Sequence, residues 1–241
     1  MKRADLLHVA IVGDEGVGKS SIVRRYKGEE FDETARITIG IDETIRKLTI
    51  ADQEYKISVA DVPGQEKLGS ATTLTFRGFQ GVLLTFDLTN RESFESLGER
   101  LAEMDRLIKE GLPKERRISN WPLVILVGNK KDLAEQRVVS DEEIEAFVRN
   151  GVETSGGHTV YPFLPDSQEE RQYFLTSAKT YENIEELFQY MAESILRYRT
   201  LFEQEKNATQ QMLQREEGES LRLGDAKQQQ QRRSNSSKCC N

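Results

Sequence analysis

One short segment near the N-terminus constrains the fold more than any other part of the chain. Residues Gly13–Ser20 read GDEGVGKS and fit the pattern G-x-x-x-x-G-K-[ST]. The apolar run Leu6–Val12 before it predicts a buried strand, and Ser20–Tyr26 after it predicts the start of a helix. A strand, a glycine loop and a helix in this order form a phosphate cradle, because backbone N–H groups and the positive helix end converge there. The alternative is a glycine-rich turn with a surface lysine, which this flanking pattern disfavours.

Each residue type in this segment has an expected role toward a nucleoside triphosphate. Lys19 is expected to reach the β- and γ-phosphates, and the Ser20 hydroxyl to bind Mg²⁺. The whole loop and the residue after it are therefore candidates for nucleotide contact: Gly13, Asp14, Glu15, Gly16, Val17, Gly18, Lys19, Ser20 and Ser21.

The charge and cysteine content argue against several other classes of protein. The chain has 241 residues and a net charge of −7, while residues 226–241 contain four basic side chains and no acid. An acidic body is a poor nucleic-acid binder, so no nucleic-acid partner is expected. The adjacent pair Cys239 and Cys240, the only cysteines, forms neither a disulfide framework nor a metal site. No apolar stretch is long enough to cross a membrane and no signal peptide is evident, so we expect a cytosolic chain.

Predicted strands and helices alternate after the cradle. Continuous apolar runs predict strands buried on both faces, alternating runs predict a hairpin, and helical spacing predicts the intervening helices. The further predicted strands are Thr44–Ile50, Glu54–Ala60, Gly81–Asp87 and Leu123–Val127, and Phe174–Ala178 is predicted to be a last short strand and its turn. A further helix is predicted to span Phe94–Ile108. A second follows a capping box at Ser140–Glu143, and a third begins at Glu182. This order indicates an α/β fold, with a mostly parallel sheet and helices on both faces. Residues 109–121 and 150–170 are predicted long connections.

Asp61-Val62-Pro63-Gly64 follows the second strand of the predicted hairpin. Here Asp61 is placed to hold a Mg²⁺-bound water, and the Gly64 N–H to reach a γ-phosphate. Alone, this D-x-x-G pattern is common and carries little weight.

Two later motifs favour guanine as the base. Asp132, in the segment NKKD, is placed to accept hydrogen bonds from N1–H and the exocyclic amine of guanine. Asn129 is expected to bridge loop and base, and the aliphatic stem of Lys130 to cover a ring face. Thr176-Ser177-Ala178-Lys179 follows the last strand, where backbone N–H groups are expected to meet the guanine carbonyl.

The four motifs each follow a predicted strand, at the sheet edge where such folds bind ligands. Their order and spacing resemble the small GTPases of the Ras superfamily, whose P-loop GTPase fold has a six-stranded sheet. Within it, Thr38–Asp42, Phe76–Gly78 and Leu84–Asn90 resemble segments of Rab proteins. The resemblance covers residues 5–198.

The resemblance implies roles that the residues alone do not give. Phe31 is expected to stack edge-on to guanine, Thr38 to coordinate Mg²⁺ and the γ-phosphate, and Gln65 to position the attacking water. The metal site is then Ser20, Thr38 and, through water, Asp61, while Ser177, Ala178 and Lys179 complete the nucleotide site. The expected activity is hydrolysis of GTP to GDP by a monomeric switch with Mg²⁺ as cofactor. Expected partners are an exchange factor, a GTPase-activating protein, effectors, and a prenylation escort or GDP-dissociation inhibitor.

Several positions depart from the Rab pattern. Glu15 stands where Rab proteins usually carry a small residue, and Pro63 replaces a usual alanine beside Gly64. The three aromatic residues that Rab proteins commonly present to effectors correspond to Glu43, Ala60 and Thr75, so the usual class of effector is in question.

The end of the chain, Lys238-Cys239-Cys240-Asn241, is not a C-a-a-X motif. Paired cysteines there resemble the doubly geranylgeranylated ends of Rab proteins, and the alternative is an unmodified thiol pair. Two lipid chains and the basic cluster predict attachment to the cytosolic face of an intracellular membrane, cycling with the cytosol. We therefore expect a GTPase domain over residues 1–198 and an extended helix end with a disordered tail over residues 199–241.

The predicted function is a Rab-type GTP-hydrolysing switch in vesicle traffic. One alternative is a GTP-bound scaffold that hydrolyses little because of Glu15 and Pro63. Another is a P-loop ATPase or nucleotide kinase, which predicts ATP binding.

Overall fold

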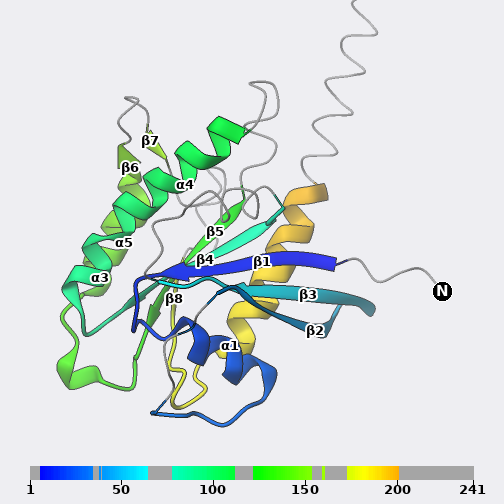
Figure 1. Ribbon diagram of the computed structural model, residues 1–241, viewed down its shortest axis with the longest axis horizontal. Coiled ribbons are helices and arrows are strands. Elements are labelled where there is room, and N and C mark those ends of the chain that lie inside the picture. The colour runs from blue at the N-terminus through cyan, green and yellow to red at the C-terminus, as the bar shows by residue number, and fades with distance from the viewer. Residues whose placement is uncertain are drawn as a thin grey trace, which may run out of the picture. The chain divides into compact units, whose positions relative to one another are not determined.

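Long apolar runs place the strands of this protein in the middle of a layered α/β structure (Figure 1). The computed structural model describes residues 6–34, 38, 40–64, 78–111, 122–153, 159–160 and 173–200. A six-stranded sheet has the order β2-β3-β1-β4-β5-β8, and all neighbours are parallel except the antiparallel pair β2 and β3. Its strands are β1 (Leu6–Gly13), β2 (Asp42–Ile50), β3 (Gln53–Asp61), β4 (Gly81–Asp87), β5 (Leu123–Asn129) and β8 (Tyr173–Leu175). The predicted fold is thus confirmed.

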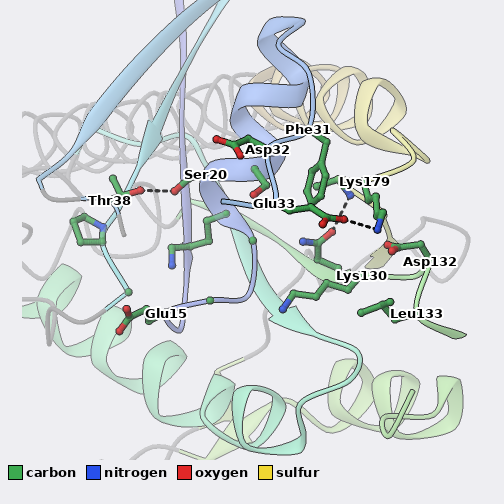
Figure 2. A pocket seen from close by; sticks show the side chains of 18 of the residues that line it. Glu15, Ser20, Phe31, Asp32, Glu33, Thr38, Lys130, Asp132, Leu133 and Lys179 are labelled. Carbon is green, nitrogen blue, oxygen red and sulfur yellow. Dashed lines mark hydrogen bonds and ion pairs between the residues drawn. The ribbon is translucent and has the colours of Figure 1, made fainter. Parts of the chain in front are cut away.

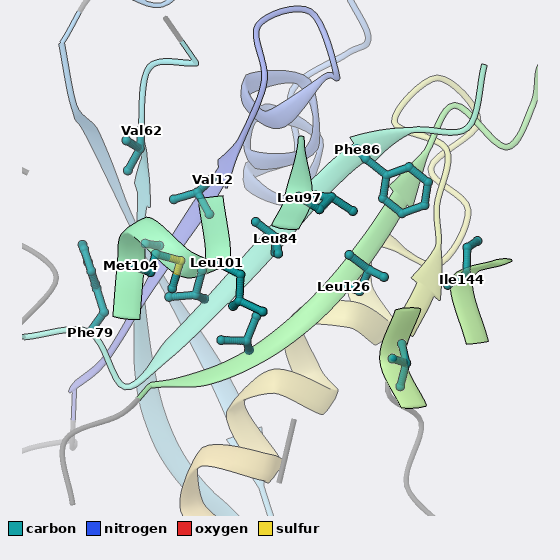
Figure 3. Close-up of a cluster of buried hydrophobic side chains, with 14 of the residues drawn as sticks. Val12, Val62, Phe79, Leu84, Phe86, Leu97, Leu101, Met104, Leu126 and Ile144 are labelled. Carbon is teal, nitrogen blue, oxygen red and sulfur yellow. The ribbon is translucent and has the colours of Figure 1, made fainter. Parts of the chain in front are cut away.

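The central strands are buried along their length because helices cover both faces of the sheet. Every residue of β4 and β5 is buried. On one face, helices α4 (Leu97–Gly111) and α5 (Asp141–Asn150) pack against the sheet (Figure 3). The cluster there includes Val12, Val62, Phe79, Leu84, Phe86, Leu97, Leu101, Met104, Leu126 and Ile144. Apolar residues at helical spacing thus face this core, as the sequence predicts.

Two helices pack together on the opposite face of the sheet. Helix α1 (Lys19–Lys27) contributes Tyr26, whose ring stacks on that of Phe188 with 3.9 Å between centroids. Phe188 belongs to a helix of residues 184–200, which begins two residues after its predicted start. Among the described residues, no helix combines the length and the apolar character needed to cross a membrane.

The hairpin of β2 and β3 turns where the sequence predicts. Ile50 pairs with Gln53, so the turn consists of Ala51 and Asp52. Both have positive φ, 47° and 61°, which matches the backbone twist of the two strands.

Two regions differ from the predicted pattern. The single helix expected from Phe94 to Ile108 is divided into α3 (Arg91–Glu95) and α4, with Ser96 between them. The predicted long connection 150–170 contains two short antiparallel strands, β6 (Val152–Glu153) and β7 (Thr159–Val160). A 3₁₀ turn, η2 (Ala134–Gln136), completes the described elements. Of the other predicted connection, 109–121, residues 112–121 lie outside the described part.

The chain groups into two compact units, Met1–Ile195 and Leu196–Asn241. In the second unit only residues 196–200 are described, and they are helical. The expected boundary at residue 198 stays a prediction.

Helix α5 offers a test of the local signals that place these elements. The Ser140 side chain accepts a hydrogen bond from the Glu143 N–H at 3.3 Å, and Glu143 accepts one from the Ser140 N–H at 2.9 Å. Replacing Ser140 with Ala should lower the free energy of unfolding by about 1 kcal/mol, since the Glu143 N–H loses its side-chain acceptor. Denaturant unfolding at one fixed nucleotide concentration measures the change. Ser140→Asp, which keeps a capping oxygen, should stay near the wild type, and equal stability of Ser140→Ala and wild type would contradict the role of the cap.

Candidate functional site

A cavity of about 390 Å³ opens where the loops after β1, β3, β5 and β8 meet (Figure 2). These loops follow the carboxyl ends of parallel strands, so the topology alone brings them to one edge of the sheet. The cavity is lined by Glu15, Gly16, Gly18, Lys19, Ser20, Ser21, Phe31, Asp32, Glu33, Thr38, Val62, Pro63, Gly64, Asn129, Lys130, Asp132, Leu133, Ala178 and Lys179. Most residues expected to bind nucleotide are in this set.

The loop Gly13–Ser20 is called the phosphate loop below, and its own backbone holds Lys19 in place. Its amino group donates to the carbonyl oxygens of Gly13, at 3.0 Å, and Asp14, at 2.8 Å. The side chain is 6% exposed. Burial lowers the pKa of Lys19 to about 8, against the opposing effect of the Asp61 carboxylate. A buried ammonium held in this way is arranged to receive an anionic group.

The loop ends in a close approach that only glycine permits. Gly18 precedes helix α1 with φ of 95°, and a Cβ there would lie 2.3 Å from the Asn129 Nδ2. That Nδ2 donates to the Val17 carbonyl at 2.8 Å. The Asn129 Oδ1 accepts from the Thr176 hydroxyl and the Ala178 N–H, each at 3.3 Å. One carboxamide thus joins the phosphate loop, the loop after β5 and the loop after β8.

The opposite end of the cavity carries the groups predicted to recognise a base. The Ser177 hydroxyl donates to one Asp132 oxygen at 2.6 Å, which orients the carboxylate. Lys130 is fixed at positive φ of 65° and pairs with Asp87 at 2.6 Å. In Figure 2, Phe31, Lys130, Asp132 and Lys179 gather at this end, away from Ser20 and Thr38.

Three oxygen-bearing side chains meet beside the phosphate loop. The Ser20 and Thr38 hydroxyl oxygens are 2.5 Å apart, and the Thr38 hydroxyl lies 3.4 Å from the Asp61 Oδ2. The Asp61 Oδ1 is buried without a hydrogen-bond partner. Burial raises the pKa of Asp61, while Ser20, Lys19 and Thr38 lower it. A buried carboxylate oxygen among hydroxyls is a donor set that Mg²⁺ prefers, so these residues fit the expected metal.

The remaining predicted positions fall into two groups. Gly13, Asp14, Val17, Asp61 and Ser177 are not among the lining residues, but each takes part in one of the hydrogen bonds described above. The expected water-positioning Gln65, the effector-facing Thr75 and the lipidation pair Cys239 and Cys240 lie outside the described residues.

The cavity also includes residues that sequence reasoning missed. Asp32, Glu33 and Leu133 line it but belong to no motif, and Val62 lies inside the D-x-x-G motif without having been given a role. Glu33 pairs with Lys179 at 2.7 Å, and both side chains are more than half exposed. The one signal in the sequence that could have placed Asp32 and Glu33 at the cavity is that they directly follow Phe31.

The positions that depart from the Rab pattern have different surroundings. Glu15 is exposed and lines the cavity beside Pro63. Glu43 is exposed and accepts a hydrogen bond from the Ser58 hydroxyl. Ala60 is only 5% exposed and belongs to the core cluster, so it presents little surface to a partner.

Comparisons with known proteins agree with this geometry. The model of the Ras family matches residues 8–197. The Ras-related protein RABD2b of Arabidopsis thaliana is 34% identical over 79% of this chain and 80% of its own length. The Ras-related protein Rab-10 of Diplobatis ommata is 32% identical over 81% and 84%, and the GTP-binding protein ypt3 of Schizosaccharomyces pombe is 28% identical over 98% and 96%. With the family model covering residues 8–197 and the sheet order and cavity in agreement with it, this chain belongs to the Ras family.

Proposed function

We propose that this Ras-family chain is a Rab-type GTPase, a switch in vesicle traffic that binds guanine nucleotide and hydrolyses GTP. One observation carries the proposal. A single cavity has the Lys19 ammonium at one end and the Asp132 carboxylate at the other, and Asn129 ties the two ends together. A cation for phosphate and an acceptor for the guanine edge are therefore held at a fixed separation.

The switch itself depends on groups at the phosphate end. We assign Thr38 and Gly64 to the third phosphate, so that both are held with GTP and released after hydrolysis. Mg²⁺ held by Ser20, Thr38 and, through water, Asp61 would neutralise phosphate charge. Gln65, which follows Gly64, is assigned to orient the attacking water. The chain's own contribution to hydrolysis is then positioning and charge stabilisation.

Regulators of the usual kinds follow from this assignment. Exchange factors, GTPase-activating proteins and effectors read the difference between the two nucleotide states. A prenylation escort or GDP-dissociation inhibitor is the partner expected for lipidated Cys239 and Cys240. With Glu43 exposed and Ala60 buried, an effector meets a carboxylate at position 43 and little side-chain surface at position 60, instead of a pair of aromatic rings.

Guanine selectivity is testable at Asp132. The change Asp132→Asn should weaken GTP binding by about 100-fold, because the charge and one of the two acceptor oxygens are lost and an amide donor then faces the exocyclic amine. Xanthosine triphosphate should bind better than it does to wild type, since its C2 carbonyl accepts from the new amide. Competition against a fluorescent nucleotide measures both affinities. Asp52→Asn, in the β2–β3 turn, is the matched control, and unchanged GTP affinity of Asp132→Asn would refute this placement of the base.

The rate of hydrolysis is testable at Glu15. A carboxylate at the cavity opposes accumulation of negative charge on the phosphates, so Glu15→Ser should raise the single-turnover rate by up to about tenfold, or about 1.4 kcal/mol in barrier. Phosphate release from preloaded protein measures it, and Glu54→Ser, at the exposed start of β3, is the control. An unchanged hydrolysis rate in Glu15→Ser would contradict the proposed effect of the carboxylate charge. Absence of phosphate release from wild type, with or without a GTPase-activating domain, would contradict hydrolysis.

Membrane attachment is testable at the paired cysteines. The full chain with Cys239→Ser and Cys240→Ser should move from the membrane to the soluble fraction of expressing cells, because stable anchoring needs two lipid signals. A single replacement should give partial, reversible binding. Ser236→Ala with Ser237→Ala keeps both thiols and is the control. Equal membrane fractions for the double cysteine variant and the wild type would exclude lipidation as the anchor.

A further inference from the structure

Arg100 of helix α4 makes a set of contacts that the proposed function does not use. Its Nε donates to the Asp14 Oδ1 at 2.7 Å, and its Nη2 forms an ion pair with the same oxygen. That Nη2 also donates to the Gly64 carbonyl at 3.0 Å. One guanidinium thus bridges the phosphate loop and the first glycine after β3, segments that are far apart in the sequence.

The carboxylate that receives Arg100 is held on its second oxygen as well. The Ser96 hydroxyl, between α3 and α4, donates to the Asp14 Oδ2 at 2.7 Å. The Asp14 and Arg100 side chains are 28% and 17% exposed, so the pair is partly withdrawn from solvent. The Asp14 backbone carbonyl accepts from Lys19, which joins the pair to the phosphate-binding lysine. A partly buried pair with a third hydrogen bond holds its geometry better than an exposed pair.

Gly64 is packed directly on the backbone of the phosphate loop. A Cβ at this position would lie 2.4 Å from the Glu15 nitrogen and 2.6 Å from the Asp14 carbonyl carbon. The neighbouring Pro63 has a fixed φ, which limits the positions open to Gly64. The position of Gly64 is therefore defined by its contact with the Asp14 and Glu15 backbone and by the hydrogen bond from Arg100.

We propose that Arg100 is a positioning residue that fixes Gly64 against the phosphate loop, so that the Gly64 N–H is prearranged for the third phosphate of a nucleoside triphosphate. This inference rests on the proposed function, since it takes the cavity as a guanine nucleotide site. When Gly64 is already held in place, binding a nucleotide costs less conformational entropy. Because a diphosphate has no third phosphate, Arg100 raises the preference for GTP over GDP rather than nucleotide affinity in general.

The guanidinium is suited to this role in a way that lysine is not. Its planar fork donates to the carboxylate and the carbonyl at the same time, whereas an ammonium is a single compact donor. The Arg100 charge also opposes that of Lys19, whose pKa it lowers. Asp14 lies between them and compensates both cations.

The test compares two nucleotides on the full chain. For Arg100→Leu, we expect affinity for a non-hydrolysable GTP analogue to fall by about tenfold, the size of one weakened hydrogen bond to a charged group. GDP affinity should stay within about twofold, since one weakened contact away from the diphosphate changes it little. Displacement of a fluorescent GDP derivative gives both constants. Single-turnover hydrolysis at saturating GTP should also slow, because Gln65 directly follows Gly64. Arg100→Lys should restore part of both losses.

Arg106→Leu on the same helix is the matched control, because Arg106 is 57% exposed and its ion pair with Glu103 spans 3.9 Å. It should leave the ratio of the two affinities unchanged. If Arg100→Leu does not fold, Ser96→Ala loosens Asp14 more gently and should shift the same ratio in the same direction.

Two results would overturn the inference. Equal losses of GTP-analogue and GDP affinity would show that Arg100 supports only the stability of the site, and unchanged affinities for both nucleotides would show that it holds nothing relevant to the third phosphate. Failure of the proposed function gives a different result, since the wild-type chain itself would then bind neither nucleotide.

Discussion

The carboxamide of Asn129 is the contact on which the geometry of the site depends. It is 1% exposed, and its two ends face different loops. The nitrogen donates to Val17 in the phosphate loop, and the oxygen accepts from Thr176 and Ala178 after β8. A buried amide with all these partners is costly to move, because each lost hydrogen bond leaves a desolvated polar group behind. The distance between phosphate and base ends is therefore set by the sheet through β5 and not by flexible loops.

The sheet was predictable because its signals are local. Continuous apolar runs identify β1, β4 and β5 to within two residues, and the hairpin follows from alternation around a polar turn. The site motifs were predictable for a related reason, since each follows a strand and parallel strands place their carboxyl ends at one edge. Neither inference needed long-range information.

What was missed depends on features with no local pattern. Ser96 keeps helical backbone angles, φ −68° and ψ −17°, so the break between α3 and α4 does not disturb the apolar spacing. Strands of two residues, such as β6 and β7, are too short to show alternation. Arg100 reads in sequence as one of many solvated helix cations, and its partner Asp14 lies 86 residues away. Only the folded chain reveals that the two meet.

The phosphate loop is thus attached to the rest of the protein on both sides of its apex. Val17 is held by Asn129 from the base side, and Asp14 is held by Arg100 and Ser96 from α4 and the segment before it. Between these attachments lie Glu15 and Gly16, which are both exposed. A larger side chain at position 15 is therefore accepted by the fold, because that side chain is exposed and the loop is held through Asp14 and Val17. We expect its effect to fall on hydrolysis and not on folding, because the carboxylate is exposed at the cavity. The Glu15 backbone is the surface against which Gly64 packs. We therefore expect one residue to act in two opposing ways: its backbone helps to place Gly64 for the third phosphate, and its carboxylate opposes the negative charge on that phosphate.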